Sequence, residues 1–159
     1  MKNSITTYSV SRSCDSDLIC YSQKEANAAS KSEKQRLIDG GFAVLADHEG
    51  IIKKEVNTYV TESGYSDAYP FEIVRIVSDI TIEIRALDTE LLNAKELKFH
   101  VGGFSAHCSN DRAQRYSYHS NEENGVIRIR KNKHGRWMQG RHRRFSLAVK
   151  PYKFHDNNF

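Results

Sequence analysis

The last 34 residues of the sequence combine cations with aromatic rings in a pattern that suits a polyanion. Residues 126–159 hold ten Lys and Arg side chains against one acid, Asp156, with Trp137, Phe145 and Tyr152 among the interleaved rings. Guanidinium groups pair with phosphates through two parallel hydrogen bonds, and rings offer stacking surfaces to unpaired bases. We therefore expect this segment to bind nucleic acid or another polyanion. The expected binding residues are Arg128, Arg130, Lys131, Lys133, Arg136, Trp137, Arg141, Arg143 and Arg144.

Two other interpretations of the same segment stay open at this point. A basic surface steers any anionic partner, so an acidic host protein would suit it as well as a nucleic acid. Charge runs are also common on faces that do no more than keep a protein solvated.

The histidines are the next residues with chemical potential. His100, His107 and His119 lie within twenty residues, and Cys108 adjoins His107. A structural zinc site needs four ligands in tetrahedral geometry, while neighbouring side chains of a strand point to opposite faces. The sequence thus predicts no metal and no other cofactor. His100 and His119 are weak candidates for a metal-independent ribonuclease, in which two imidazoles and a cation such as Arg128 surround a phosphate.

Charge is distributed unevenly along the chain of 159 residues, which is a length typical of one domain. Residues 1–99 carry 12 basic and 16 acidic side chains, whereas residues 100–159 carry 12 basic and 4 acidic ones. No apolar run is long enough for a transmembrane helix, and no apolar segment resembles a secretory signal. We expect a cytoplasmic protein with no membrane contact, in which Cys14, Cys20 and Cys108 are free thiols.

The N-terminal part is expected to hold a polar arm and one helix. Residues 1–21 are rich in Ser and Thr and predict an extended arm with at most one short strand. Ser22-Gln23-Lys24-Glu25 fits a capping box, and Gly40-Gly41 supplies a stop, so we predict a helix over 22–39. These elements form residues 1–41, and a β domain occupies residues 42–159.

Strand signals dominate after Gly41. Residues 42–45 and 51–60 predict two strands. The clearest hairpin joins residues 71–77 to residues 80–85, where Ile80, Ile82 and Ile84 share one face and alternate with polar side chains. Residues 88–96 could form one helical turn, but the sequence favours a long loop.

The basic segment itself is predicted to be strand-rich. Asn124-Gly125 is a strong hairpin-turn signal, and in residues 126–130 Arg128 and Arg130 share one face while the isoleucines between them fill the core. A turn over 131–135 and further strands near 136–138 and 145–149 follow. The fold class is therefore mainly β (α+β), a small antiparallel meander or barrel-like domain with one N-terminal helix. A meander with open edges is typical of chains that form a homodimer.

Several short motifs follow one another in a fixed order through the second half of the chain. They are DAYPFEIV (67–74), GGFSAHC (102–108), Tyr116-x-Tyr118, IRIR (127–130), GRW (135–137) and FHDNNF (154–159). This ordered set, over roughly residues 65–159, resembles small accessory proteins that tailed bacteriophages and related mobile elements encode. The resemblance implies a barrel-like β domain and carries over no catalytic activity. We therefore expect a non-enzymatic protein that binds nucleic acid, with inhibition of a host defence complex, in the manner of anti-restriction or anti-CRISPR proteins, and a small phosphodiesterase as the alternatives.

Overall fold

The computed structural model describes residues 3–10, 18–21, 23–39, 52–102 and 105–158. Its contacts divide the chain into two compact units, which are described one at a time. The smaller unit is Ile5–Asn57, and the larger comprises Thr58–Phe159 together with the residues before Ile5. This division differs from the boundary after residue 41 that the sequence predicts, because a strand that follows residue 51 pairs within the smaller unit.

The smaller unit is a three-stranded antiparallel sheet with one helix, α1. Its strands are β1 (Ile5–Val10), β2 (Leu18–Cys20) and β3 (Ile52–Asn57), in the order β2-β1-β3. Residues 1–21 are therefore not a simple arm, since they contribute two paired strands. The buried Asn57 side chain donates hydrogen bonds to Thr7 Oγ1 (2.8 Å) and to the carbonyl of Ile5 (3.1 Å), which ties β3 to β1.

Helix α1 (Gln23–Asp39) agrees with the predicted helix. Ser22 and the Gly40-Gly41 stop lie outside the described residues, but Glu25 Oε2 accepts a hydrogen bond from the backbone N–H of Tyr21 (3.1 Å), as the acid of an N-terminal cap does. Ala26 is fully buried in a small cluster with Val10 and Cys20. The helix thus packs through Ala26 on β1 and β2.

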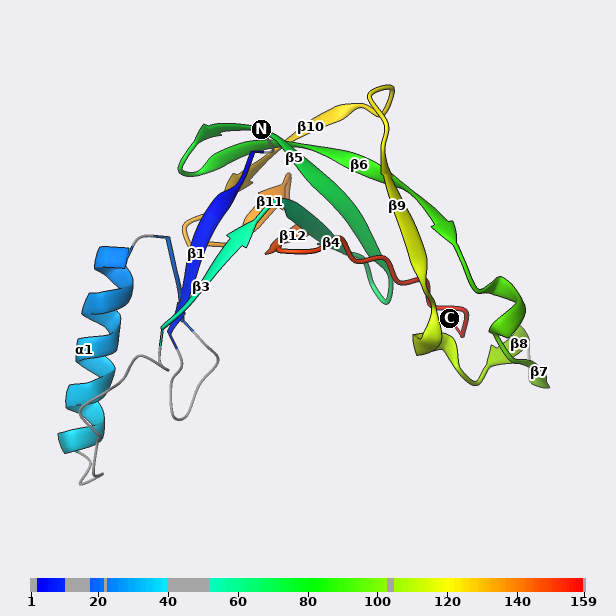
Figure 1. Ribbon diagram of the computed structural model, residues 1–159, viewed down its shortest axis with the longest axis horizontal. Helices are drawn as coiled ribbons and strands as arrows, with labels where there is room; N and C mark the ends of the chain where they lie inside the picture. The colour runs from blue at the N-terminus through cyan, green and yellow to red at the C-terminus, as the bar shows by residue number, and fades with distance from the viewer. Residues whose placement is uncertain (1–2, 11–17, 22, 40–51, 103–104, 159) are drawn as a thin grey trace. The chain divides into compact units, whose positions relative to one another are not determined.

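The larger unit is built around a closed antiparallel barrel of six strands (Figure 1). Strand β10 pairs with β11 on one side and with β6 on the other, and this second pairing completes the ring. Each barrel strand thus has a partner on both sides, and the expected homodimer stays a prediction. The predicted mainly β, barrel-like fold with one N-terminal helix is confirmed. The barrel strands are β4 (Tyr59–Ser63), β5 (Ala68–Ser78), β6 (Thr81–Leu91), β10 (Val126–Lys131), β11 (Trp137–Gln139) and β12 (Arg143–Ala148).

Alternation along each strand fills the barrel with apolar side chains. The rings of Phe71 on β5 and Phe145 on β12 meet edge to face, with centroids 5.7 Å apart and an interplanar angle of 79°. Ile82 and Ile84 on β6 are fully buried, as is Ile129, which pairs with Ile82. The predicted isoleucine face is confirmed at these β6 positions, whereas Ile80 precedes the strand and is exposed.

The predicted hairpin is the β5–β6 pair, and β6 is longer than the sequence indicates. It reaches Leu91, so the loop predicted over 88–96 is wrong for residues 88–91, while Ala94–Glu96 forms a short 3-10 turn. Beyond the barrel, β9 (Tyr116–Ser120) lies alongside the last part of β6 (Figure 1). The extra length arises because β6 has two successive partners on one edge, β10 and then β9.

Two other sequence predictions of local structure are corrected. In place of the single strand predicted over 51–60, residues 52–60 belong to two strands of different sheets, β3 and β4, separated at Thr58. Asn124-Gly125 is not a hairpin turn, because β9 and β10 do not pair with each other and both pair with β6. The Asn124 amide instead donates to Asp88 Oδ1 (2.8 Å) and to the carbonyl of Ala86 (3.1 Å), which holds the connection against β6.

A second small sheet and the C-terminal segment complete the larger unit. Strands β7 (Phe99–Gly102) and β8 (Ser105–Cys108) pair only with each other among the described strands, and the predicted strand over 42–45 lies outside the described residues. The C-terminal segment returns to β5, where Ala68 and Phe154 exchange backbone hydrogen bonds of 3.0 and 3.1 Å. None of the described helices has the length and hydropathy to cross a bilayer.

Candidate functional site

The outer face of the barrel carries a row of arginines in register. Arg130 on β10 lies opposite Met138 on β11, and Met138 lies opposite Arg144 on β12. Residues directly opposite one another across adjacent strands project from the same face of the sheet. Both arginines are exposed, and neither has a carboxylate partner among the described residues. Two unpaired guanidinium groups therefore lie two strands apart, about 10 Å, on one face.

Glu83, an acid on the same outer face, already forms ion pairs with two other arginines. Glu83 on β6 receives hydrogen bonds from Arg75 on β5 (2.8 and 3.0 Å) and from Arg128 on β10 (2.6 and 3.2 Å). Arg75 first and Arg128 second hold the pKa of Glu83 down to about 2. Glu83 therefore stays ionised and satisfied, and its negative charge does not neutralise Arg130. The expected binding residue Arg128 faces the predicted side, but it is one arm of this ion triad.

Three further cations of the expected set lie in the turns that flank β11. Lys133 and Arg136 are exposed in the β10–β11 turn, where Asn132 Oδ1 accepts the backbone N–H groups of His134 (2.9 Å) and Arg136 (3.0 Å). The exposed Arg141 lies in the β11–β12 turn. Successive antiparallel turns alternate between the two ends of a barrel. Lys133 and Arg136 therefore lie at one end of β11, and Arg141 lies at the other end.

Lys131 and Trp137 point into the barrel, which corrects their expected role as surface contacts. Trp137 is only 3% exposed, and the Lys131 Nζ lies 5.1 Å above the centre of its ring. Trp137 is also in register with the buried Phe145, so neither ring offers a stacking surface. The Trp137 Nε1 is buried without a hydrogen-bond partner among the described atoms. The period-two alternation that exposes Arg128 and Arg130 also turns Lys131 inward.

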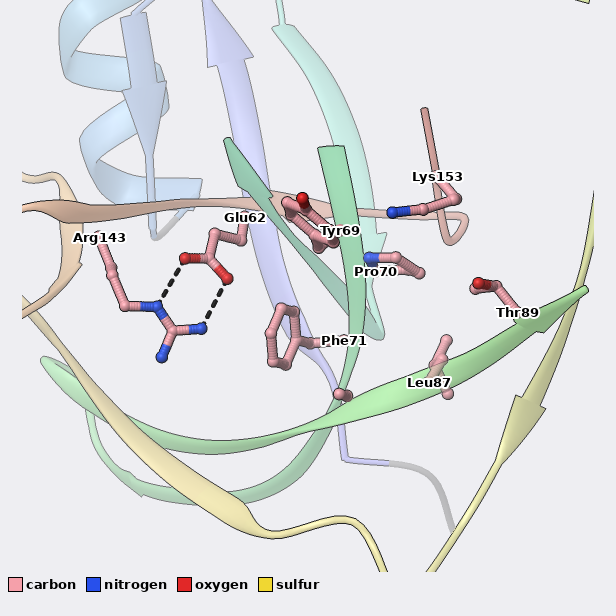
Figure 2. Close-up of a pocket in the computed structure, with 9 residues that line it drawn as sticks. Glu62, Tyr69, Pro70, Phe71, Leu87, Thr89, Arg143 and Lys153 are labelled. Atoms are coloured by element: carbon pink, nitrogen blue, oxygen red, sulfur yellow. Dashed lines mark hydrogen bonds and ion pairs between the residues drawn. The ribbon is translucent and has the colours of Figure 1, made fainter. Parts of the chain in front are cut away.

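One mouth of the barrel opens into a pocket of about 280 Å³ (Figure 2). At one side, Arg143 and Glu62 form a two-pronged ion pair with both N···O distances at 2.6 Å. Arg143 also donates to the side chain of Gln139, so each of its three guanidinium nitrogens makes one hydrogen bond. The expected binding residue Arg143 thus lines a pocket and does not belong to the outer row. The full lining is Glu62, Tyr69, Pro70, Phe71, Ala86, Leu87, Thr89, Arg143 and Lys153.

Lys153 enters the other side of this pocket from the C-terminal segment (Figure 2). Its Nζ lies 3.8 Å from the centre of the Tyr69 ring, and its backbone N–H donates to the Tyr118 hydroxyl (3.1 Å). Burial lowers the pKa of the Lys153 ammonium, which Asp67 partly offsets. Asp67 also accepts the Tyr69 hydroxyl (2.8 Å), and this hydrogen bond raises the pKa of Tyr69. The pocket therefore holds a partly desolvated cation against an aromatic face.

The two weak catalytic candidates lie on strands of different sheets. His100 is on β7, where its Nε2 contacts Ser109 Oγ (3.1 Å). His119 on β9 is opposite Asp88 of β6, and Arg128 on β10 is opposite Glu83 of the same strand, so His119 and Arg128 are about 16 Å apart along β6. These positions do not support the ribonuclease hypothesis, which stays a prediction.

The thiols and imidazoles of the described residues do not gather into a metal site. Cys20 and Cys108 are buried free thiols in different units, as expected for reduced cysteines, and Cys14 lies outside the described residues. His107 is opposite His100 across the small sheet. Within the described ranges, no three side chains of His, Cys, Asp or Glu come together as metal ligands would.

No protein-family model, curated protein or solved structure matches this chain.

Sequence reasoning missed the pocket residues Glu62, Tyr69 and Lys153 as a group. One usable signal was present, because Glu62 shares the alternation of the buried Val60 and must face the barrel interior. An inward carboxylate predicts an inward cation, but its partner Arg143 is 81 residues away in the chain. The register that joins β12 to β4 supplies that pairing, and no local pattern encodes it.

Proposed function

We propose that this chain is a non-enzymatic accessory protein of a phage or mobile element that binds nucleic acid in the host cytoplasm. The outer barrel face would contact phosphates through Arg130 and Arg144 in the row. Lys133, Arg136 and Arg141 would add contacts from the two turns that flank β11. The observation that carries this proposal is the in-register pair Arg130 and Arg144, exposed and without carboxylate partners in the described part of the chain.

The contacts favour binding to the backbone over reading of bases. Both candidate stacking rings near the row, Trp137 and Phe145, are buried. Guanidinium groups on a sheet surface fix phosphates without distinguishing sequence. Binding of this type is driven by counterion release and weakens steeply as salt rises. We therefore expect binding with little sequence preference and a strong dependence on ionic strength.

The test compares the wild-type protein with the double variant Arg130→Gln/Arg144→Gln by fluorescence anisotropy on a labelled duplex and on a single strand. Each lost phosphate contact makes the slope of log affinity against log salt shallower by about 0.9 on a duplex, so the double variant changes it by about 1.8. When salt rises from about 50 to 200 mM, the affinity of the double variant should therefore fall about 12-fold less than the affinity of the wild type.

The matched control is Lys95→Gln/Arg112→Gln, which removes the same charge from exposed positions in the 3-10 turns outside the barrel. We expect its salt slope to equal that of the wild type. Absence of binding to either nucleic acid at low salt, or an equal effect of the two double variants, would overturn the proposal.

A second candidate function is inhibition of a host defence complex through protein contact. Ile76, Val77 and Ile80 are 41–44% exposed at the end of the β5–β6 hairpin, and protein interfaces combine an apolar centre with a charged rim. If this second candidate is correct, Val77→Asp should abolish co-purification of a host partner. Arg130→Gln/Arg144→Gln should only reduce the amount of that partner recovered. If Val77→Asp has no effect on a recovered partner, this candidate is wrong.

A further inference from the structure

We propose that the pocket at the barrel mouth binds a single nucleotide, with its phosphate on Lys153 and its base against Tyr69 and the apolar floor. This rests on the proposed function, since the nucleotide would belong to a bound strand or be a free mononucleotide of the same chemistry. The pocket is separate from the outer arginine row, because its lining residues Glu62, Tyr69 and Phe71 share the inward face of the buried Val60 and Phe145.

The pocket has an apolar middle bounded by two polar ends. Phe71 and Leu87 are buried side chains whose surfaces form the floor, and Pro70 and the half-exposed Tyr69 flank them (Figure 2). A volume of about 280 Å³ suits a small ligand and is too confined for a peptide or a base pair. A flat aromatic group can pack against the rings in this middle. Because every base has a flat face, such stacking accepts any base.

Lys153 supplies the position for the phosphate. Its Nζ contacts the face of Tyr69, and over the described residues it has no hydrogen-bond acceptor. An ammonium group carries three donors, and leaving them unpaired in a partly desolvated site is costly. A phosphate oxygen would satisfy them, and the Thr89 hydroxyl at the same end of the pocket could donate a second hydrogen bond (Figure 2).

The Glu62–Arg143 pair sets the orientation of the ligand. Each Glu62 oxygen accepts one hydrogen bond from Arg143, which leaves a lone pair on each oxygen for a further donor. The amino and ring N–H groups of a base are such donors, whereas a phosphate at this end would meet the carboxylate charge. An anionic end, a flat middle and a donating end occur in this order in a nucleotide.

The backbone around Lys153 is held in place before any ligand binds. Phe154 pairs with Ala68 on β5, and the backbone N–H of Asp156 donates to Asp67 Oδ1 (2.8 Å). Because Asp67 also accepts the Tyr69 hydroxyl, one carboxylate positions both the ring and the segment that carries the lysine. A preorganised site loses less entropy when a ligand binds.

The first experiment titrates the wild-type protein by calorimetry with the four ribonucleoside monophosphates, the matching nucleosides, ribose 5-phosphate and inorganic phosphate. We expect the monophosphates to bind most tightly, because they alone engage both ends of the pocket. Lys153→Met keeps an unbranched, largely apolar stem and should weaken monophosphates about 10-fold or more while leaving nucleosides unchanged. Tyr69→Ser should weaken both by about 5- to 150-fold.

The matched control is Lys150→Met, which removes an exposed lysine three residues earlier that does not line the pocket. Trp137 fluorescence verifies that each variant keeps the barrel folded. Equal affinity of wild type and Lys153→Met for monophosphates would overturn the assignment of the phosphate to Lys153. Binding of no monophosphate at millimolar concentration, together with unchanged oligonucleotide affinity of Lys153→Met, would overturn the pocket proposal as a whole.

The second experiment separates the two sources of the nucleotide and the two proposals. A short single strand and a blunt duplex are titrated against Lys153→Met and against Arg130→Gln/Arg144→Gln. Loss of affinity in Lys153→Met for the single strand, but not for the duplex, identifies a strand-borne nucleotide. If monophosphates bind and neither oligonucleotide does, the proposed function fails while the pocket stands as a site for a free nucleotide.

Discussion

Ile129 provides the most direct measure of barrel closure. It lies on β10 opposite Ile82 of β6, both side chains are 0% exposed, and this strand pair closes the ring. Ile129→Ala removes three buried carbons, worth about 2.4 kcal/mol of transfer free energy at roughly 0.8 kcal/mol each. The cavity left behind adds to this, so we expect a loss of about 3–4 kcal/mol in the free energy of unfolding. The milder Ile129→Val should cost about 1 kcal/mol.

Urea denaturation followed by Trp137 fluorescence is the appropriate assay. Trp137 is the only tryptophan of the chain and pairs with Lys131 at the end of β10, so it reports on this part of the barrel. The control is Val126→Ala, which changes an outward, 50% exposed side chain of the same strand and should alter stability by no more than about 0.5 kcal/mol. Equal costs for Ile129→Ala and Val126→Ala would refute the packing of β10 in a closed barrel.

Two further predictions concern pH and backbone conformation. Arg75 and Arg128 hold the pKa of Glu83 at about 2, below its ordinary 4.5, so its stabilising effect is complete above pH 4.5 and is lost as pH falls toward 2. Glu83→Gln should therefore flatten the loss of stability over this range in urea titrations at several pH values, and parallel losses would contradict the ion triad. Gly135 has a φ of 76° in the β10–β11 turn, so Gly135→Ala should cost about 1 kcal/mol. Gly125→Ala should leave stability unchanged, because a Cβ there meets no atom and φ is not positive. If Gly125→Ala costs as much stability as Gly135→Ala, the predicted hairpin turn at Asn124-Gly125 would be correct after all.

The β5–β6 hairpin shows what the sequence reveals well. Its period-two alternation is a local property, and burial of Ile82 and Ile84 follows from it directly. The same rule places Arg128 and Arg130 on the outside of β10. The turn itself lies at Asp79 and Ile80, one residue later than the predicted Ser78-Asp79, because Ser78 is the last residue of β5 and pairs with Thr81.

Predictions failed where pairing partners are distant in sequence. Asn124-Gly125 has the residue types of a tight turn, but β9 and β10 each pair with β6 and not with each other. Trp137 is a residue type that commonly stacks on bases, but it is in register with Phe145, so its side chain faces the barrel interior. The division of residues 51–60 at Thr58 likewise follows from sheet membership and not from any breaker residue.

The Glu62–Arg143 pair also has a consequence for synthesis of the protein. The two residues are 81 positions apart, so at about 5–20 residues per second a ribosome needs about 4–16 s to add the second after the first. During this interval β4 and β5 exist without β12, and their apolar inner faces are uncovered. Folding dominated by such distant pairings takes about milliseconds to seconds once the chain is complete. The pocket is consequently among the last features to form, and translation sets the earliest moment at which it can exist.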